Sequence, residues 1–481
     1  MSTIALGWTA VLIYFLITGA LAVRGARRTR SLASYAVGAG DLPAVVVGLS
    51  LAAQLTSVAT FVVNPGLVYA FGTTVLFGYG VSAALGITLG LTFFSRRFRS
   101  HGVRVRALTV PQWIGARYDS TPLRAAFAVL SLGLVTFATL IVVALALVLG
   151  SLLALPPGEV AVGLIAIVVT GVMFGGATGH AWTNAVQAGV MLVVALLLIG
   201  AGLPLLGAEP GVGARLAVID PNLAGVVNRA SPYFRNVFEV FVCNFLVGLA
   251  IVCQPHIMSK ALYLRDDRQV RWYLGTAIAV GLVFTAVLTT GVWARLTLTE
   301  PVAIDRAIPT WIAANFSPAL QVLVTIGLLG AGLSTLEGIL LALSATFSAD
   351  FYPLLAREPS ERAAMRVGRL GLVAVGVVTA VLVFWQLEHP TGGTVAIFAQ
   401  YGVYLLFSAS FLPLACGMFA PRASRALVTW SVVAAVGTYT AVAFLRITPL
   451  HNNPAFLATS AIAAGWLVVA SGLLRGQPRT T

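Results

Sequence analysis

Charged residues are scarce in this sequence: only 9% of its 481 residues are Asp, Glu, Lys or Arg, whereas 59% are apolar. About a quarter of the residues of a typical soluble protein are charged. Residues 125–158 carry no charge at all, and this stretch is longer than the roughly 20 apolar residues that cross a bilayer as a helix. The shortage of charge excludes an array of soluble domains and predicts an all-α integral membrane protein.

Cysteine is also rare, since the chain has only Cys243, Cys253 and Cys416, each within an apolar stretch. Three thiols cannot form a fully paired disulfide framework, and the sequence supports no zinc site. No polar stretch is long enough to form a separate soluble domain. These absences place the function of the chain inside the membrane.

Long apolar runs are what the sequence does contain, and they predict about 13 transmembrane helices. The predicted spans are residues 4–22, 42–71, 73–94, 125–149, 161–176, 185–205, 237–258, 272–292, 318–347, 370–387, 394–419, 427–444 and 455–474. With the N-terminus outside, 23 of the 29 basic residues fall on the inner side, as the positive-inside rule expects. We therefore expect a multi-pass protein of the cell membrane, plasma or inner, with a cytoplasmic C-terminus. The formal charge of +14 then follows from topology and needs no nucleic-acid partner.

Polar residues interrupt two of the predicted spans. The second span carries five polar side chains within eleven positions, directly before a Pro-Gly pair: Gln54, Thr56, Ser57, Thr60 and Asn64. The seventh span carries Asn244 in its middle and, near its inner end, Gln254, Pro255 and His256. Unpaired backbone within hydrocarbon is tolerated only where protein or a water-filled cavity supplies partners. The interruptions therefore indicate discontinuous helices around an internal site.

The second and the seventh span each begin a series of five spans, and the two series start on opposite sides of the membrane. This is the arrangement of an inverted-repeat secondary transporter. We expect a peripheral helix in residues 1–24, a first five-helix repeat in residues 42–206, a second in residues 235–419 and two peripheral helices in residues 424–475. The 5+5 inverted-repeat core thus has one helix before it and two after it.

Five segments resemble the sodium:solute symporter family, in the order and spacing of that family. They are the second span and the stretches VRALTVPQWIGARYDS, FGGATGHAWTNAVQ, CQPHIMSKALYLRDDRQVR and GLLGAGLSTLEGILLALSATFSADFY. The resemblance covers roughly residues 34–352. It implies a leucine-transporter-type fold and a sodium-coupled symporter that imports a small organic solute by alternating access. Sodium would be the coupling ion, with no other cofactor.

Members of this family hold a sodium ion between the broken first core helix and the eighth core helix. Carried over to this chain, the resemblance implies five uncharged oxygen ligands: the carbonyls of Ala53, Thr56 and Ala331 and the hydroxyls of Ser334 and Thr335. Sodium is a hard cation that prefers oxygen ligands, and a break in a helix frees carbonyls to supply them. The alternative for the two hydroxyls is hydrogen bonding to their own helix.

The chain departs from the family pattern near this site. Many members have Trp-Thr-Asp at the start of the fifth core helix, and this aspartate can contribute to a second sodium site, whereas this chain has Asn184 there. A carboxylate appears instead at Glu337, one helical turn after Ser334. Because an intramembrane carboxylate is costly, Glu337 and Asn184 are a candidate second cation site, for sodium or a proton. The alternative is a glutamate that reaches an inner aqueous vestibule.

The candidate substrate-binding residues are polar residues on core helices that surround the solute in this fold: Gln54, Ser57, Thr60, Asn244 and Gln400. Sugar-transporting relatives have a tyrosine gate at the position of Leu249, which argues against a sugar. No arginine is expected in mid-membrane, so an anionic solute would rely on helix N-termini and hydroxyl groups. We expect a small monocarboxylate or an amino acid.

The sequence also bears on classes of function other than sodium symport. An enzyme needs a nucleophile with a base, or a metal cluster, at one depth of the membrane. None of the five histidines is expected in mid-span, and His256 is interpreted as an interfacial residue at a helix end, so an enzyme is not expected. A transporter-like membrane sensor and a proton-coupled symporter stay open as alternatives. The expected partners are the solute, sodium and the lipid bilayer, and the sequence leaves the oligomeric state open.

Overall fold

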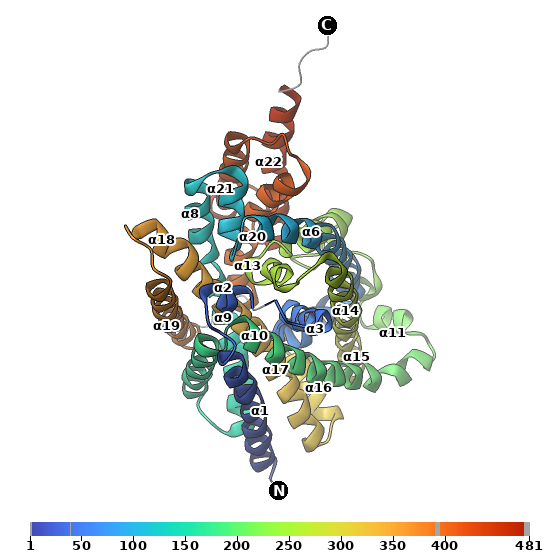
Figure 1. Cartoon of the computed structure of the whole chain (residues 1–481). Helices are drawn as coiled ribbons and strands as arrows, with labels where there is room; N and C mark the ends of the chain where they lie inside the picture. Colours follow the sequence, from blue (N-terminus) through green and yellow to red (C-terminus); the bar gives the residue numbers. More distant parts are fainter. Residues whose placement is uncertain (1, 39, 390–394, 476–481) are drawn as a thin grey trace.

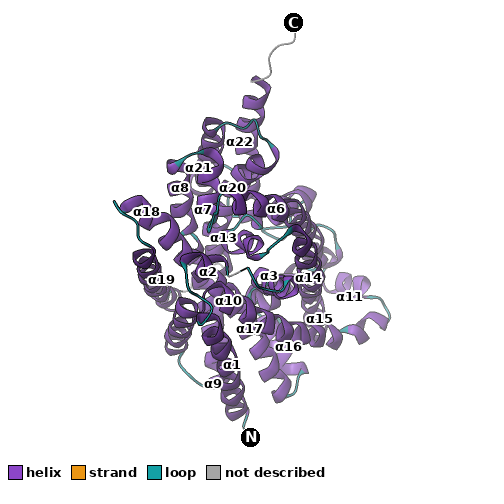
Figure 2. Ribbon diagram, viewed as in Figure 1, coloured by secondary structure: helices purple, strands orange, loops and turns teal. Residues whose placement is uncertain are grey.

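The computed structural model describes residues 2–38, 40–389 and 395–475, and every regular element in these ranges is a helix (Figure 2). The first half of the chain contains α1 (Thr3–Ala26), α2 (Leu32–Val37), α3 (Ala44–Leu55), α4 (Asn64–Phe71), α5 (Thr73–Val75), α6 (Ala84–Arg104), α7 (Val110–Tyr118), α8 (Thr121–Ser131), α9 (Leu134–Leu153), α10 (Pro157–Ala201) and α11 (Val212–Ile219). The second half contains α12 (Asn244–Ile251), α13 (Pro255–Met258), α14 (Asp267–Ala286), α15 (Thr290–Thr297), α16 (Ile304–Asn315), α17 (Pro318–Thr346), α18 (Tyr352–Leu355), α19 (Glu361–Glu388), α20 (Val395–Phe419), α21 (Arg425–Leu445) and α22 (Pro454–Arg475). The all-α prediction is confirmed.

Within the described ranges, ten helices are long and apolar enough to cross a membrane, and two bent pairs raise the number of spans to as many as twelve. The sequence predicted about 13. The difference lies in α10, whose 45 residues cover two predicted spans, 161–176 and 185–205. A straight helix of 45 residues would be about 68 Å long, roughly twice the thickness of the hydrocarbon core.

Gly176 divides α10 into two parts. Its φ of 55° and ψ of −163° are not helical, and a positive φ favours glycine because it has no Cβ. A Cβ at this position would lie 3.0 Å from the Thr29 hydroxyl and 3.2 Å from the Tyr35 ring. The break at Gly176 therefore falls at the end of the predicted span 161–176, and the part of α10 after it contains the span 185–205.

Both interruptions predicted from polar residues are bends of 57° between helical segments. The first separates Ala44–Leu55 from Ala59–Phe71, and the second separates Phe238–Ile251 from Pro255–Tyr263. Thr56 ends α3 because its backbone is extended, with φ of −111° and ψ of 101°. At the second bend Gln254 is extended and Pro255 begins α13, as expected because proline disfavours a helical conformation in the residue before it.

The helices α3 and α17 lie in the interior of the molecule. Figure 1 shows α3 near the centre, with α10, α13, α14 and α17 around it, α1 on one side and α21 with α22 on the opposite side. In the most apolar 18-residue stretch of the span that contains α17, 89% of the residues are buried. Such burial is expected for a helix that is apolar on all sides. Helix α17 packs against α3, α9, α10 and α19. This packing brings the middle of α17 against the break after α3.

Candidate functional site

Oxygen atoms of α3 and α17 cluster at the break after α3. The Ser334 hydroxyl lies 3.0 Å from the Ala53 carbonyl oxygen and 3.0 Å from that of Ala331. The Thr335 hydroxyl lies 3.3 Å from the same Ala331 oxygen and 3.2 Å from the Gln54 carbonyl oxygen. Each hydroxyl therefore makes one contact within its own helix and one across to α3. Four of the five predicted sodium ligands belong to this buried cluster.

Thr56, the fifth predicted ligand, is the residue at which α3 ends. Its backbone nitrogen donates to the Ala53 carbonyl oxygen over 3.1 Å, so Thr56 stays close to the cluster. Because its backbone is extended, its own carbonyl leaves the hydrogen-bonding pattern of the helix. Uncharged oxygens at a helix break are the type of donor that suits a hard monovalent cation.

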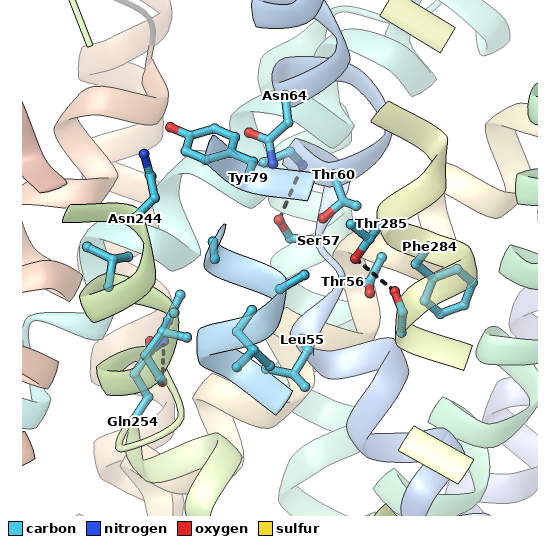
Figure 3. Close-up of a pocket in the computed structure, with 18 of the residues that line it drawn as sticks. Leu55, Thr56, Ser57, Thr60, Asn64, Tyr79, Asn244, Gln254, Phe284 and Thr285 are labelled. Atoms are coloured by element: carbon cyan, nitrogen blue, oxygen red, sulfur yellow. Dashed lines mark hydrogen bonds between the residues drawn. The ribbon is translucent and has the colours of Figure 1, made fainter. Parts of the chain in front are cut away.

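A cavity of about 250 Å³ lies beside the break and is lined by both discontinuous spans and by parts of α6, α9, α14 and α20 (Figure 3). Its described lining contains no charged side chain. In Figure 3, Asn244 and Gln254 come from one side of the cavity, and Thr60 and Thr285 come from the other. The polar lining residues are Thr56, Ser57, Thr60, Asn64, Tyr79, Thr88, Asn244, Gln254, Thr285, Gln400 and Tyr404. The cavity offers hydroxyl and amide groups between apolar walls.

Four of the predicted substrate-binding residues line this cavity: Ser57, Thr60, Asn244 and Gln400. Gln54 is not part of its lining. The Gln54 side chain is buried against Gly338 of α17 and lines a smaller cavity together with His180 and His256. The reason is its position in the last turn of α3, which faces α17, whereas Ser57 and Thr60 follow the break.

Four further polar residues line the cavity that are not among the predicted substrate-binding residues: Asn64, Tyr79, Gln254 and Tyr404. Asn64 and Gln254 lie in the interrupted spans, so their position in the sequence was a usable signal. Tyr79 and Tyr404 reach the cavity only because the tertiary structure brings the segment before α6 and the middle of α20 together. Nothing in their local sequence marks them.

Glu337 points from α17 toward α10 and meets three α10 side chains there. The Thr183 hydroxyl donates to its carboxylate over 2.9 Å, and the Gln187 amide donates over 3.4 Å. His180 Nδ1 lies 3.3 Å from the same carboxylate. Only 14% of the Glu337 side chain is exposed, so hydrogen bonds hold the carboxylate within the helix bundle.

Asn184 bridges three helices beside the oxygen cluster. Its amide nitrogen lies 3.3 Å from the Ser50 carbonyl oxygen of α3 and 3.4 Å from the Ser334 carbonyl oxygen of α17. His180 Nε2 lies 3.5 Å from the same nitrogen. Asn184 is therefore connected to Glu337 through His180.

Two histidines lie deeper than the sequence indicated. His180, which was not expected in mid-span, is buried within α10, and His256, which was expected at an interface, is only 2% exposed. Hydropathy cannot distinguish the end of a span from a break inside the bundle. The predictions therefore place His180 in the gap between two spans and His256 at the inner end of the seventh span, whereas both lie beside breaks in the interior of the helix bundle.

Comparison with known proteins identifies the family of the chain. The sequence profile of the sodium:solute symporter family matches residues 35–433. A sodium/pantothenate symporter of Haemophilus influenzae is 26% identical over 400 residues, which cover 80% of each chain. The high-affinity proline transporter PutP of Bacillus subtilis is 25% identical over 411 residues, which cover 80% of this chain and 81% of PutP.

The fold is also shared with solved transporters. A Na⁺-coupled sialic acid symporter in a substrate-bound, outward-open state superposes with a TM-score of 0.83, at 16% identity and over 98% of both chains. This likeness confirms the fold class expected from the sequence, and the matched relatives are transporters rather than enzymes, also as expected. The chain is a multi-pass, sodium-coupled symporter and belongs to the sodium:solute symporter family.

Proposed function

We propose that the transported solute is a small monocarboxylate or amino acid that binds in the cavity beside the two helix breaks. The observation that carries this proposal is the cavity lining, which is polar at the breaks and has no charged side chain among the described residues. A solute with several charges would leave them uncompensated there at high cost. The cavity volume of about 250 Å³ lies below the roughly 300–1,000 Å³ of pockets for drug-sized ligands, which favours a small solute.

A single carboxylate can be held in this cavity without an arginine. The segment Ala59–Phe71 begins directly after the break. The Ala59 N–H donates to the Ser57 hydroxyl over 3.2 Å and the Thr60 N–H donates to the Ser57 carbonyl over 3.0 Å, so the positive end of this helix lies at Ser57. A helix N-terminus favours negative charge. Ser57 and Thr60 add hydroxyl groups at this point, and Gln400 adds an amide for the other end of the solute. The Asn244 amide nitrogen donates to the carbonyls of Glu239 and Val240, so Asn244 offers its amide oxygen.

The coupling sodium ion is proposed to bind the carbonyls of Ala53, Thr56 and Ala331 and the hydroxyls of Ser334 and Thr335. The contacts of the two hydroxyls across to α3 support this assignment. Thr56 also lines the solute cavity, so the ion and the solute would contact the same backbone segment. That shared segment is a physical basis for coupled binding, because an ion that fixes the break also fixes one wall of the cavity.

Glu337 and Asn184 are proposed as a second cation site. Among the described residues, His180 is the only ion-pair partner of Glu337, and a histidine is not a permanent counter-ion. A carboxylate that lies in the membrane without a fixed cation attracts a mobile one. We favour a second sodium ion, since Asn184 already contacts the Ser334 carbonyl oxygen of the first site.

The division of the chain into two inverted repeats, residues 42–206 and 235–419, is part of this proposal. The peripheral segments are then residues 1–24 and 424–475. In its support, each 57° bend lies in the first span of its repeat. Opposed repeats would rock against each other in alternating access. The N-terminus is proposed to lie outside the cell membrane and the C-terminus in the cytoplasm, as the distribution of basic residues indicates.

Uptake into proteoliposomes tests the proposed solute class. Purified protein is given radiolabelled lactate, propionate, proline or alanine under an inward sodium gradient, with choline in place of sodium as one control and glucose in place of the solute as another. We expect sodium-dependent accumulation of at least one acid or amino acid and none of glucose. Accumulation of glucose alone, or equal accumulation in choline, would overturn the proposal.

A further inference from the structure

Lys260 is a buried amino group that neither the proposed sodium site nor the solute cavity uses. It is 1% exposed and lies in the segment Pro255–Tyr263, the second half of a bent span. Its ammonium nitrogen lies 2.6 Å from the Ser50 hydroxyl of α3 and 5.1 Å from the centre of the Tyr263 ring. The described part of the chain places no carboxylate within ion-pair distance of it.

Lys260 is also the only lysine in the sequence, since the other 28 basic residues are all arginine. An arginine side chain keeps its proton in proteins, whereas a lysine can lose its proton when it is buried. Lys260, which donates a hydrogen bond to α3 just before the break, is therefore a basic residue whose charge can change.

A short series of hydrogen bonds connects Lys260 to the proposed sodium ligands. Ser50 lies three residues before Ala53 on α3, so the two residues share a face of the helix. The Ser50 carbonyl accepts a hydrogen bond from Asn184 over 3.3 Å, and Asn184 also contacts the Ser334 carbonyl oxygen over 3.4 Å. Neither Ser50 nor Asn184 is charged, so neither would offset the repulsion between an ammonium group and a sodium ion.

The titratable and charged groups around Lys260 come from every side. His256 and Tyr263 belong to its own segment, and the elements packed against it or linked to it contribute Tyr35 of α2, Arg99 of α6, His180 of α10 and Glu337 of α17. Glu337 is the only carboxylate among them, and its described hydrogen bonds go to α10. Hydrogen bonds link it to Ser50 through His180 and Asn184, and its negative charge also acts on Lys260.

We propose that sodium and the Lys260 proton compete, so that sodium binding at the Ala53–Ser334 cluster displaces one proton from Lys260. The proton passes to water on the side to which the protein is open, and the neutral amine keeps its hydrogen bond to Ser50. Reprotonation from the cytoplasm then favours release of sodium. One proton leaves for each sodium ion that binds at this cluster, so the cycle carries one proton outward as sodium and solute enter. This inference rests on the proposed sodium ligands.

Because the chain has one lysine, an NMR experiment can observe this group directly in the unmodified protein. Full-length protein with isotope-labelled lysine in lipid nanodiscs gives one lysine side-chain signal. At a fixed pH where part of the signal is in the ammonium form, addition of sodium chloride should convert it to the amine form, and choline chloride should not. A signal that responds equally to both salts, or to neither, between about pH 6 and about pH 10 would overturn the proposal.

Binding of radiolabelled sodium to two variants provides the second test. In the wild type, apparent sodium affinity should rise with pH, by up to about tenfold per pH unit for one-to-one exchange. Lys260→Gln should bind sodium with high affinity at every pH, and Lys260→Arg should bind it weakly at every pH because its charge is permanent. The same pH dependence in Lys260→Gln as in the wild type would contradict the exchange.

These outcomes can be told apart from failure of the proposed ligands. If Ser334→Ala leaves sodium binding intact while the Lys260 signal still responds to sodium, the ligand assignment fails and the exchange with Lys260 stands. If Ser334→Ala abolishes binding while the wild-type Lys260 signal ignores sodium, the ligands stand and the exchange is wrong. The NMR arm needs no substitution, so a variant that does not fold cannot leave the question undecided.

Discussion

The Ser334 hydroxyl of α17 lies 3.0 Å from the Ala53 carbonyl oxygen of α3, two residues before α3 ends. Carbonyls in the last turn of a helix are not all used by the helix itself. The Ala53 carbonyl accepts one hydrogen bond from the Thr56 N–H, and its second lone pair is available to α17 or to a cation. Because Thr56 follows in the same segment and lines the proposed solute cavity, this contact is the point at which occupancy of the proposed sodium site would affect solute binding.

The charge of Glu337 should matter for accumulation of the solute. Glu337→Gln keeps the shape of the side chain and removes the charge that would attract a second cation. We expect sodium-driven accumulation of labelled solute to be lost, whereas exchange at equal concentrations survives, since the oxygen cluster at Ser334 is unchanged. The control is Glu388→Gln at an exposed helix end. Unaltered sodium and pH profiles in Glu337→Gln would make Glu337 a solvated vestibule residue.

Asn184→Asp should partly restore transport in the Glu337→Gln variant. The substitution returns a carboxylate to the position at which many family members have one, and the residue lies 3.4 Å from the Ser334 carbonyl oxygen. Accumulation in proteoliposomes is compared in the double variant and in Glu337→Gln alone. If Asn184→Asp gives no recovery, the idea that the charge has moved from one helix to the other is wrong.

Polar residues of the cavity should control the affinity for solute. Thr60→Val and Asn244→Ala each remove a hydrogen-bonding group from the lining, worth about 0.5–1.5 kcal/mol. We therefore expect the solute KM to rise by up to roughly tenfold in each variant, with little change in the sodium concentration for half-maximal uptake. Thr92→Val is the matched control, because the Thr92 hydroxyl bonds to Thr88 of its own helix. An unchanged KM in both variants would place the solute elsewhere.

The asymmetry of basic residues predicts the direction of insertion. Ser100 and Gly211 are both exposed, and each is replaced by cysteine after the three native cysteines are removed. An impermeant thiol reagent applied to intact cells should label the cysteine at position 211 and not the one at position 100. Labelling at position 100 with none at position 211 would invert the proposed topology.

The ion pair between the half-buried Arg124 and the buried Asp350 should contribute strongly to stability. Asp350 is fully buried and accepts hydrogen bonds from Arg124 over 2.8 Å and from Thr109 over 2.7 Å. Asp350→Asn leaves the half-buried Arg124 charge without its partner, which costs at most the roughly 3–5 kcal/mol of a fully buried pair. We expect Asp350→Asn to lower Tm strongly. The double variant Asp350→Asn, Arg124→Gln should lower Tm by less than the sum of the effects of the two single variants. The control is Asp41→Asn in an exposed pair, which should change stability by at most about 1 kcal/mol. Equal falls in Tm for Asp350→Asn and Asp41→Asn would contradict this account.

The sequence was most informative where polar residues enter an apolar run. The bends after Leu55 and before Pro255 could be predicted, because hydrocarbon tolerates unpaired backbone only beside protein or water. The division of α10 at Gly176 was visible only as a gap between two apolar runs. Hydropathy could not place His180 or His256 inside the bundle, since a polar stretch at an interior break resembles the end of a span.

The direction of individual side chains was harder to predict than the position of the breaks. Ser334 and Thr335 could be assigned to α3 only through the resemblance to a family, and their contacts to Ala53 and Gln54 fit that assignment. Gln54 and Ser57 are three residues apart, yet they line different cavities because the break separates them. Such a change of direction depends on the bend angle, which no local pattern contains.

Binding of radiolabelled sodium to purified protein tests whether α3 and α17 hold the coupling sodium ion, without any knowledge of the solute. The double variant Ser334→Ala, Thr335→Val removes two of the five proposed oxygen ligands and keeps α17 apolar. The control is Thr325→Val, since the Thr325 hydroxyl bonds to Gln321 of its own helix. We predict saturable sodium binding in the wild type and the control, and an affinity lower by at least about tenfold in the double variant. Equal sodium affinity in the double variant and the wild type would contradict the account.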